Sequence, residues 1–81
     1  MVIDHSVSKD LKRVPRNIAS RVFSVIEELQ YDPYVGDIEK MSGEKNLWRR
    51  RTGDYRIFYE VLVREKTLRV MHVARRTSKT Y

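Results

Sequence analysis

Four arginines fall within residues 49–56, where they are interleaved with aromatic side chains. They are Arg49, Arg50, Arg51 and Arg56. A guanidinium binds phosphate oxygens bidentately and keeps its charge at any relevant pH. Several guanidinium groups on one face could therefore hold a phosphate and stabilise the charge that develops on it during transfer. The alternative is a solvated strand face whose charges discourage pairing with other sheet edges.

The excess positive charge lies in the second half of the chain. Residues 46–81 contain ten Lys and Arg against three Asp and Glu, a net charge of +7, whereas residues 1–45 carry a net charge of −1. Such an asymmetry is typical of an anion-binding face. Together with the arginine cluster, it favours a phosphate-binding surface over a merely charged one.

Two other side chains could transfer protons. Histidine is the side chain best suited to proton transfer near neutral pH, and His72 is expected on an open sheet face, with a structural role as the alternative. Tyr81 ends a basic tail, and nearby positive charge would favour the phenolate that a general base requires. The alternative for Tyr81 is a terminal residue without a role. Two distant histidines and no cysteine provide no ligand cluster, so we expect neither a metal nor another cofactor.

Length and hydropathy indicate one small domain over residues 1–81. No signal peptide is visible at Met1, and no apolar run approaches the ~20 residues that span a bilayer. We therefore expect a cytoplasmic protein that makes no membrane contact.

The elements that must position these side chains follow from periodicity. A short strand over residues 2–5 precedes helices over 8–14 and 17–31, a loop over 34–44, and strands over 46–51, 55–63 and 67–74. The longer helix has one apolar side, formed by Ile18, Val22, Val25, Ile26 and Leu29. The predicted fold is α+β, with an N-terminal strand and a two-helix hairpin packed on an antiparallel sheet.

Alternation along the strands predicts which side chains share the face that the helices leave open. The occupants expected there are Arg49, Arg51, Arg56, His72 and Arg76. In the last strand, alternation separates Arg69, Met71 and Val73 from Leu68, Val70, His72 and Ala74. Trp48, Phe58 and Tyr59 are expected to be packing residues. Arg50 falls on the opposite side from Arg49 and Arg51, where an aliphatic residue would be expected.

The chain resembles the RelE/ParE toxin superfamily over nearly its whole length. Three stretches carry the resemblance: KDLKRVP before an amphipathic helix, LWRRRTGDYRIFYEV, and LRVMHVARRTSKTY. The resemblance implies a small toxin that forms a hetero-oligomer with a cognate antitoxin. RelE-like members cleave messenger RNA on the ribosome, whereas ParE-like members share the fold and act on DNA gyrase.

Resemblance to the RelE branch also implies roles for individual residues. Arg56 would hold the scissile phosphate, and Arg76, or Arg75 if the register slips by one, would act as phosphate ligand and general acid. Tyr81 would act as base and as a stacking platform. Arg49 would support the transition state. The expected RNA-binding residues are Arg51, Arg75, His72 and Lys79.

The predicted function is thus that of a toxin endoribonuclease that acts on ribosome-bound mRNA. A 2′-hydroxyl would attack the adjacent phosphate, so that no metal is needed. Two alternatives remain open. One is a gyrase inhibitor without nuclease activity, and the other is a generic nucleic-acid-binding module, which would bind in a salt-sensitive manner without cleavage.

Overall fold

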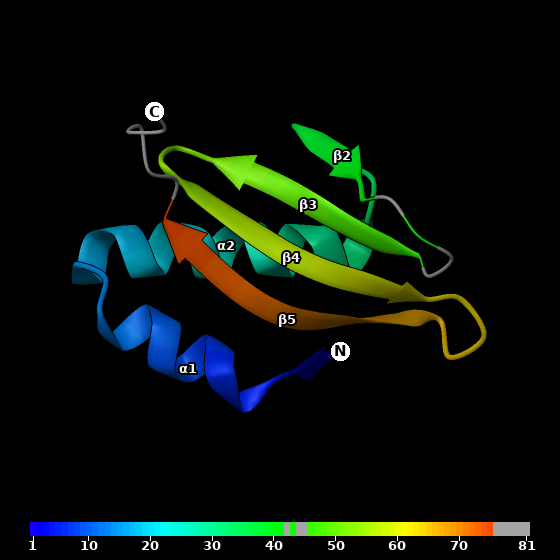
Figure 1. Ribbon diagram of the computed structural model, residues 1–81, viewed down its shortest axis with the longest axis horizontal. Coiled ribbons are helices and arrows are strands. Elements are labelled where there is room, and N and C mark those ends of the chain that lie inside the picture. The colour runs from blue at the N-terminus through cyan, green and yellow to red at the C-terminus, as the bar shows by residue number, and fades with distance from the viewer. Residues whose placement is uncertain (42, 44–45, 76–81) are drawn as a thin grey trace.

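The computed structural model describes residues 1–41, 43 and 46–75, which form a five-stranded sheet and two helices (Figure 1). In chain order, the elements are β1 (Val2–Ile3), α1 (His5–Lys12), α2 (Arg16–Tyr31), β2 (Ile38–Lys40), β3 (Leu47–Thr52), β4 (Tyr55–Leu62) and β5 (Thr67–Arg75). The predicted α+β class, with two helices packed on a sheet, is confirmed. Within the described residues, no helix is long and apolar enough to cross a membrane.

The strand order is β1-β5-β4-β3-β2, and the sheet is mixed rather than wholly antiparallel. The meander of β3, β4 and β5 is antiparallel as predicted, but β1 pairs with β5 in parallel. A second difference is β2, which pairs with β3 inside the segment predicted to be a loop. Three residues are too few for a periodic signal, and pairing with β3 is what makes this segment a strand.

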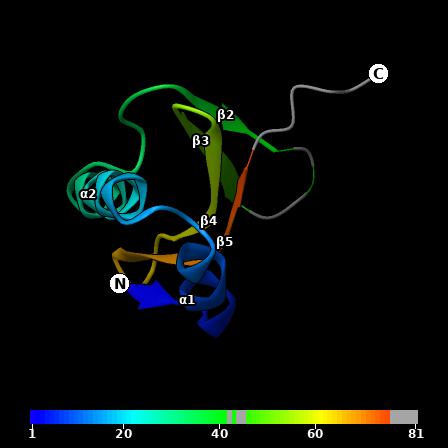
Figure 2. The same ribbon diagram turned by 90° about the vertical axis from the view of Figure 1, so that its left-hand side faces the viewer.

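Helix α2 covers one face of the sheet and forms the core with it (Figure 2). Val22, Val25, Ile26 and Leu29 are buried on the helix, as their helical spacing predicts. The sheet contributes the alternate residues of β4 and part of β5: Tyr55, Ile57, Tyr59, Leu68, Val70 and Val73. The other face, turned away from α2, is called the open face below.

Strand β1 covers only a short part of the β5 edge, because it has two residues. Helix α1 lies along the rest of that edge, and its side chains form hydrogen bonds with backbone groups of β5 (Figure 1). Ser6 donates its hydroxyl to the Met71 carbonyl at 2.8 Å, and the Val73 amide donates to Asp10 Oδ2 at 3.0 Å. Asp4 accepts two hydrogen bonds of 2.9 Å from the Arg69 guanidinium, which ties the start of α1 to β5. The bonds from Ser6 and to Asp10 occupy backbone groups of β5 that would otherwise be free to pair with another strand.

A β-bulge at Met71 changes which residues of β5 face the core. Phe58 is opposite His72, but Tyr59 is opposite Val70, so Met71 is the extra residue. Leu68 and Val70 point into the core before the bulge, and Val73 does so after it. The strict alternation predicted for residues 67–74 is therefore wrong after Val70. The bulge places His72 on the open face, where it was expected.

Candidate functional site

The open face carries its arginines in two neighbouring rows that run across the strands. Residues directly opposite one another in an antiparallel pair point to the same side of the sheet. The first row is Glu39, Arg49, Phe58 and His72, and the second row is Arg51, Arg56 and Ala74. The structure thus brings together Arg49, Arg51, Arg56 and His72, as the sequence predicted.

Acidic side chains from β2 and the residues before it hold two of these arginines. Arg49 pairs with Glu39, and the Arg51 Nε donates to Asp37 Oδ2 at 3.1 Å. Both carboxylates are well exposed, so each pair contributes little to stability, about 0–1 kcal/mol. A phosphate could therefore replace either carboxylate at small cost.

Arg56 occupies the centre of the second row, between Arg51 and Ala74. Its Nε is buried and has no hydrogen-bond partner among the described residues. The Arg50 Nε is in the same state, so what distinguishes Arg56 is its place on the open face among basic side chains, where a guanidinium can donate to phosphate oxygens. This geometry suits a side chain that binds an anion.

His72 ends the first row and is held on two sides. Its ring stacks on Phe58 with a centroid separation of 5.7 Å and an interplanar angle of 22°. Its Nδ1 lies 3.0 Å from Asp10 Oδ2, the same oxygen that accepts the Val73 amide. Phe58, which was expected to be a packing residue, instead supports this ring on the open face.

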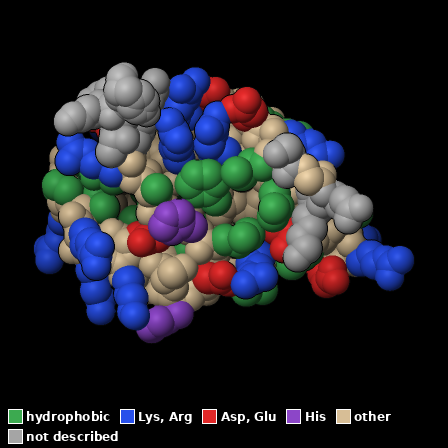
Figure 3. All heavy atoms as spheres, in the orientation of Figure 1, with side chains coloured by type: hydrophobic (Ala, Val, Ile, Leu, Met, Phe, Trp, Pro, Cys, Tyr) green, Lys and Arg blue, Asp and Glu red, His purple; other side chains and the backbone are tan. Residues whose placement is uncertain are grey.

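Two hollows meet at His72. The first, of about 270 Å³, is apolar and is lined by Met41, Leu47, Trp48, Phe58, Tyr59, Met71 and His72. The second, of about 320 Å³, lies between α1 and the end of β5 and is lined by Asp10, Arg13, Val14, Tyr55, His72, Val73, Ala74 and Arg75. Figure 3 shows a histidine on this face beside a band of hydrophobic side chains, with basic side chains above the band. A planar apolar group and a charged group could therefore lie side by side here.

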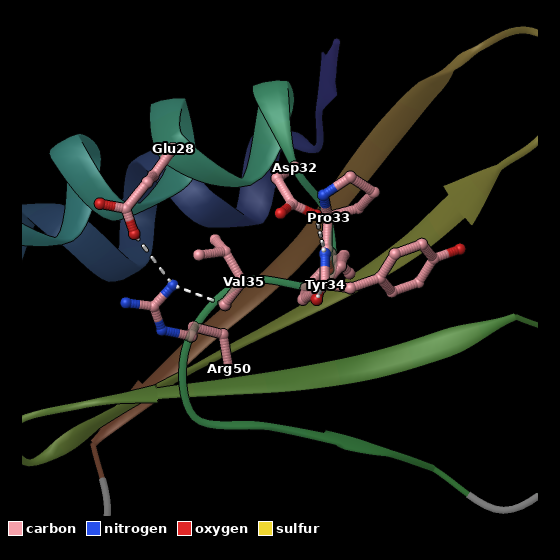
Figure 4. Close-up of polar contacts among 7 residues, drawn as sticks. Glu28, Asp32, Pro33, Tyr34, Val35 and Arg50 are labelled. Carbon is pink, nitrogen blue, oxygen red and sulfur yellow. Dashed lines mark hydrogen bonds and ion pairs between the residues drawn. The ribbon is translucent and has the colours of Figure 1, made fainter.

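Arg50 has a structural role that the sequence left unexplained. It lies on the α2 side of β3, opposite Ile57, and its Nη1 donates to the Val35 carbonyl at 3.0 Å and to Glu28 Oε1 at 3.2 Å (Figure 4). Gly36 leaves room for this guanidinium and has a φ of +86°. Arg50 therefore holds the segment before β2 against α2.

Tyr59 fixes the same segment from the middle of the sheet. Its side chain is fully buried, and its hydroxyl donates to the Pro33 carbonyl. Burial raises the pKa of Tyr59 to about 12, so the phenol stays protonated and keeps donating this bond at neutral pH. Together with Arg50, this contact positions the residues that lead to Asp37 and Glu39.

The remaining predicted site residues lie elsewhere. Arg75 is opposite Tyr55, on the α2 side of the sheet, and is exposed there. The alternative in which the register slips by one residue and brings Arg75 beside Arg56 is therefore wrong. Arg76, Lys79 and Tyr81 lie outside the described residues. Within the described part of the chain, no group of three acidic or histidine side chains could hold a metal ion.

The sequence analysis missed Asp10, Asp37 and Glu39 as neighbours of the arginines and of His72. Each contacts a residue at least ten positions away along the chain. Local spacing contains no signal for such contacts. An excess of acidic residues in the first half was visible, but their partners depend on the pairing of β2 with β3 and of α1 with β5.

The arrangement of helices and sheet matches that of solved toxin structures. Residues 2–79 match the sequence family described as the ParE toxin of the type II toxin–antitoxin system parDE. The chain therefore belongs to this family, within the RelE/ParE superfamily.

Individual relatives agree with that assignment. Toxin RelE3 of Methanocaldococcus jannaschii is 44% identical over 57 residues, an alignment that covers 65% of each protein. The chain spans just under two thirds of that relative. Among solved structures, the RelB–RelE complex from Methanococcus jannaschii is matched with a TM-score of 0.75, 33% identity and coverage of 93% of this chain and 90% of that chain. The RelE–RelB complex from Pyrococcus horikoshii is matched with a TM-score of 0.81, 28% identity and coverage of 95% and 93%.

Proposed function

We propose that this toxin is an endoribonuclease that cleaves mRNA on the ribosome in the cytoplasm. The observation that carries the proposal is the set of three arginines, Arg49, Arg51 and Arg56, gathered in adjacent rows beside Phe58 and His72. Such a face offers bidentate phosphate ligands next to an aromatic surface on which a base can stack. The similarity to proteins named RelE toxins favours the same activity.

The reaction is an internal transfer. The ribose 2′-hydroxyl attacks the adjacent phosphorus, the bond to the 5′-oxygen breaks, and the products end in a cyclic phosphate and a 5′-hydroxyl. The nucleophile is already part of the substrate, so the protein contributes positioning and electrostatic stabilisation, and no metal is required. Arg56 holds the phosphate, while Arg49 and Arg51 bind the flanking backbone once they leave Glu39 and Asp37.

The resemblance adds Arg76 as a phosphate ligand and acid, Tyr81 as a base or stacking platform, and Lys79 and Arg75 as RNA-binding residues. Arg75 can fill that role only from the hollow that it shares with Arg13, because it is not on the open face. The others remain predictions.

The proposed partner in the cell is a cognate antitoxin. The solved relatives from two archaea are complexes of RelE with RelB. A half-chain with a net charge of +7 offers an electrostatic target for an acidic partner, which would form a hetero-oligomer with the toxin.

Cleavage mapping on translating ribosomes tests the proposal. The Arg56→Ala and Arg76→Ala variants should cleave about 100-fold more slowly, the usual effect of removing one donor to a developing charge. The matched control is Arg64→Ala, which removes an exposed arginine from the β4–β5 turn and should leave cleavage unchanged. Undiminished cleavage in both site variants would contradict the assignment of these arginines.

The second candidate function is inhibition of DNA gyrase without RNA cleavage. It is favoured by the match to a family described by the name ParE, because ParE-like members act on gyrase. A supercoiling assay run beside a translation assay separates the two functions. Inhibited supercoiling with intact messages would establish the second candidate and exclude the first.

A further inference from the structure

The open face contains a pair of side chains that the arginine chemistry does not use. His72 and Asp10 are separated by 62 positions in the sequence and come from β5 and α1. His72 Nδ1 and Asp10 Oδ2 are 3.0 Å apart. The imidazole is about half exposed, whereas the carboxylate is largely covered, with 22% of its side chain accessible.

This contact favours one form of the imidazole. A negatively charged oxygen 3.0 Å from Nδ1 favours the tautomer that carries its proton on Nδ1, which leaves Nε2 as the acceptor. Asp10 is itself held, because Oδ2 also accepts the Val73 amide at 3.0 Å. Stacking on Phe58 limits rotation of the ring. A proton acceptor oriented by a carboxylate is the arrangement that general-base catalysis uses.

The position of the pair suits the proposed substrate. His72 is directly opposite Phe58, and Arg56 lies in the next row, so His72 and Arg56 are diagonal neighbours on one face. His72 also lines both hollows, the apolar one beside Phe58 and the polar one beside Arg75. A base stacked in the apolar hollow would place its ribose at His72, with the following phosphate directed toward Arg56.

From this geometry we propose that His72 is the general base of RNA cleavage and that Asp10 is its positioning residue. The Nε2 atom accepts the proton of the ribose 2′-hydroxyl as the 2′-oxygen bonds to phosphorus. The bond from phosphorus to the 5′-oxygen breaks, and the leaving oxygen takes a proton from solvent water. The imidazolium then returns its proton to the hydroxide formed from that water. The Asp10 carboxylate stabilises the transient imidazolium.

This inference rests on the proposed ribonuclease function, and it assigns the base role to His72 in place of Tyr81. A purely structural role would make the His72–Asp10 contact a means of securing α1 to β5. The two roles are separable because Asn at position 72 can still donate to Asp10 through its side-chain amide, but it has no group equivalent to Nε2.

The test measures single-turnover cleavage of mRNA on programmed ribosomes with saturating toxin. His72→Asn is expected to slow cleavage by about 100-fold or more, the usual contribution of a general base. Asp10→Asn keeps an acceptor oxygen but loses the negative charge, so we expect a smaller loss of about tenfold. The matched control is His5→Ala, which removes the other histidine from an exposed position at the start of α1. That variant should cleave at the wild-type rate.

Chemical rescue distinguishes a catalytic role of His72 from a purely structural one. With His72→Ala, added imidazole should restore part of the cleavage rate, whereas it should not accelerate Arg56→Ala. Thermal unfolding of His72→Asn and Asp10→Asn, compared with wild type, verifies that both variants are folded.

Three outcomes would contradict the general-base role of His72 or the ribonuclease function on which it rests. Cleavage by folded His72→Asn at the wild-type rate, while Arg56→Ala is slow, would overturn the inference and leave the ribonuclease function intact. A large loss in Tyr81→Phe combined with full activity in His72→Asn would return the base role to Tyr81. Absence of cleavage by the wild-type protein would overturn the proposed function and the inference together.

Discussion

The replacement of Gly36 by alanine probes how Arg50 holds the segment that leads into β2. Gly36 has a φ of +86°, and a Cβ atom built there would lie 2.6 Å from Nη1 and 2.7 Å from Nε of Arg50. The substitution therefore imposes an unfavourable backbone conformation and also displaces the guanidinium. A left-handed backbone costs a non-glycine residue about 1–2 kcal/mol.

Displacement of Arg50 adds a second cost. The hydrogen bond from Nη1 to the Val35 carbonyl has a charged donor, and such bonds contribute about 1.5–3 kcal/mol. The ion pair with Glu28 is discounted because the Glu28 side chain is mostly exposed. We therefore expect Gly36→Ala to lower the free energy of unfolding by about 3 kcal/mol. For a domain of this size, that is a decrease in melting temperature on the order of 15 °C.

The assay is urea unfolding followed by circular dichroism, with Gly53→Ala as the matched control. Gly53 also has a positive φ, of +58°, but an added Cβ would meet no atom within 4 Å. In the Gly53→Ala control, the free energy of unfolding should therefore fall by about 1 kcal/mol, which is the backbone cost alone. In an Arg50→Met background the clash disappears, so the cost of Gly36→Ala should fall to the same value. Equal losses for Gly36→Ala and Gly53→Ala, or a cost of Gly36→Ala that is unchanged by Arg50→Met, would refute this reasoning.

Two further predictions concern the ion pairs. Glu39→Gln releases Arg49, whereas Glu65→Gln makes the same charge change at an exposed position in the β4–β5 turn. The Glu39→Gln variant should therefore bind single-stranded RNA up to about fivefold more tightly than the Glu65→Gln variant. Equal affinities in a fluorescence titration would contradict a competition between Glu39 and phosphate. The hydrogen bonds from Arg69 lower the pKa of Asp4, so this carboxylate stabilises the fold above its unfolded pKa of about 4 and stops doing so as the pH falls through the lower folded value. The wild-type protein should therefore exceed Asp4→Asn in urea midpoint at pH 7, and the difference should shrink at acid pH; a difference that is constant with pH would exclude this ion pair as its cause.

Much of the architecture could be predicted because its signals are local. The apolar spacing in residues 17–31 identified the longer helix, and alternation in residues 55–62 identified the buried side of the central strand. The same alternation placed Arg49, Arg51 and Arg56 together on one face. Each of these signals repeats several times within one element, so single exceptions do not obscure it.

The features that could not be predicted depend on pairing between distant segments. β2 exists because Ile38–Lys40 lies along β3, and the direction of β1 is set by its partner β5. Arg50 was unexplained because its partners, Glu28 and Val35, precede it by 22 and 15 positions. A partly buried guanidinium is stabilised by acceptors that the fold brings to it, and no local pattern identifies those acceptors.

The sequence alone determined the basic second half and the arginines around the Thr52–Asp54 turn, since residue type and short-range period are enough to define them. The toxin superfamily was also identified from the sequence, through its resemblance to known members. Tertiary structure decided which neighbours these side chains have. The bulge at Met71 turns His72 to the open face, and the packing of α1 on β5 brings Asp10 to its ring. A strand shifted by one residue presents its other face, so the composition of the site depends on register, which only long-range pairing fixes.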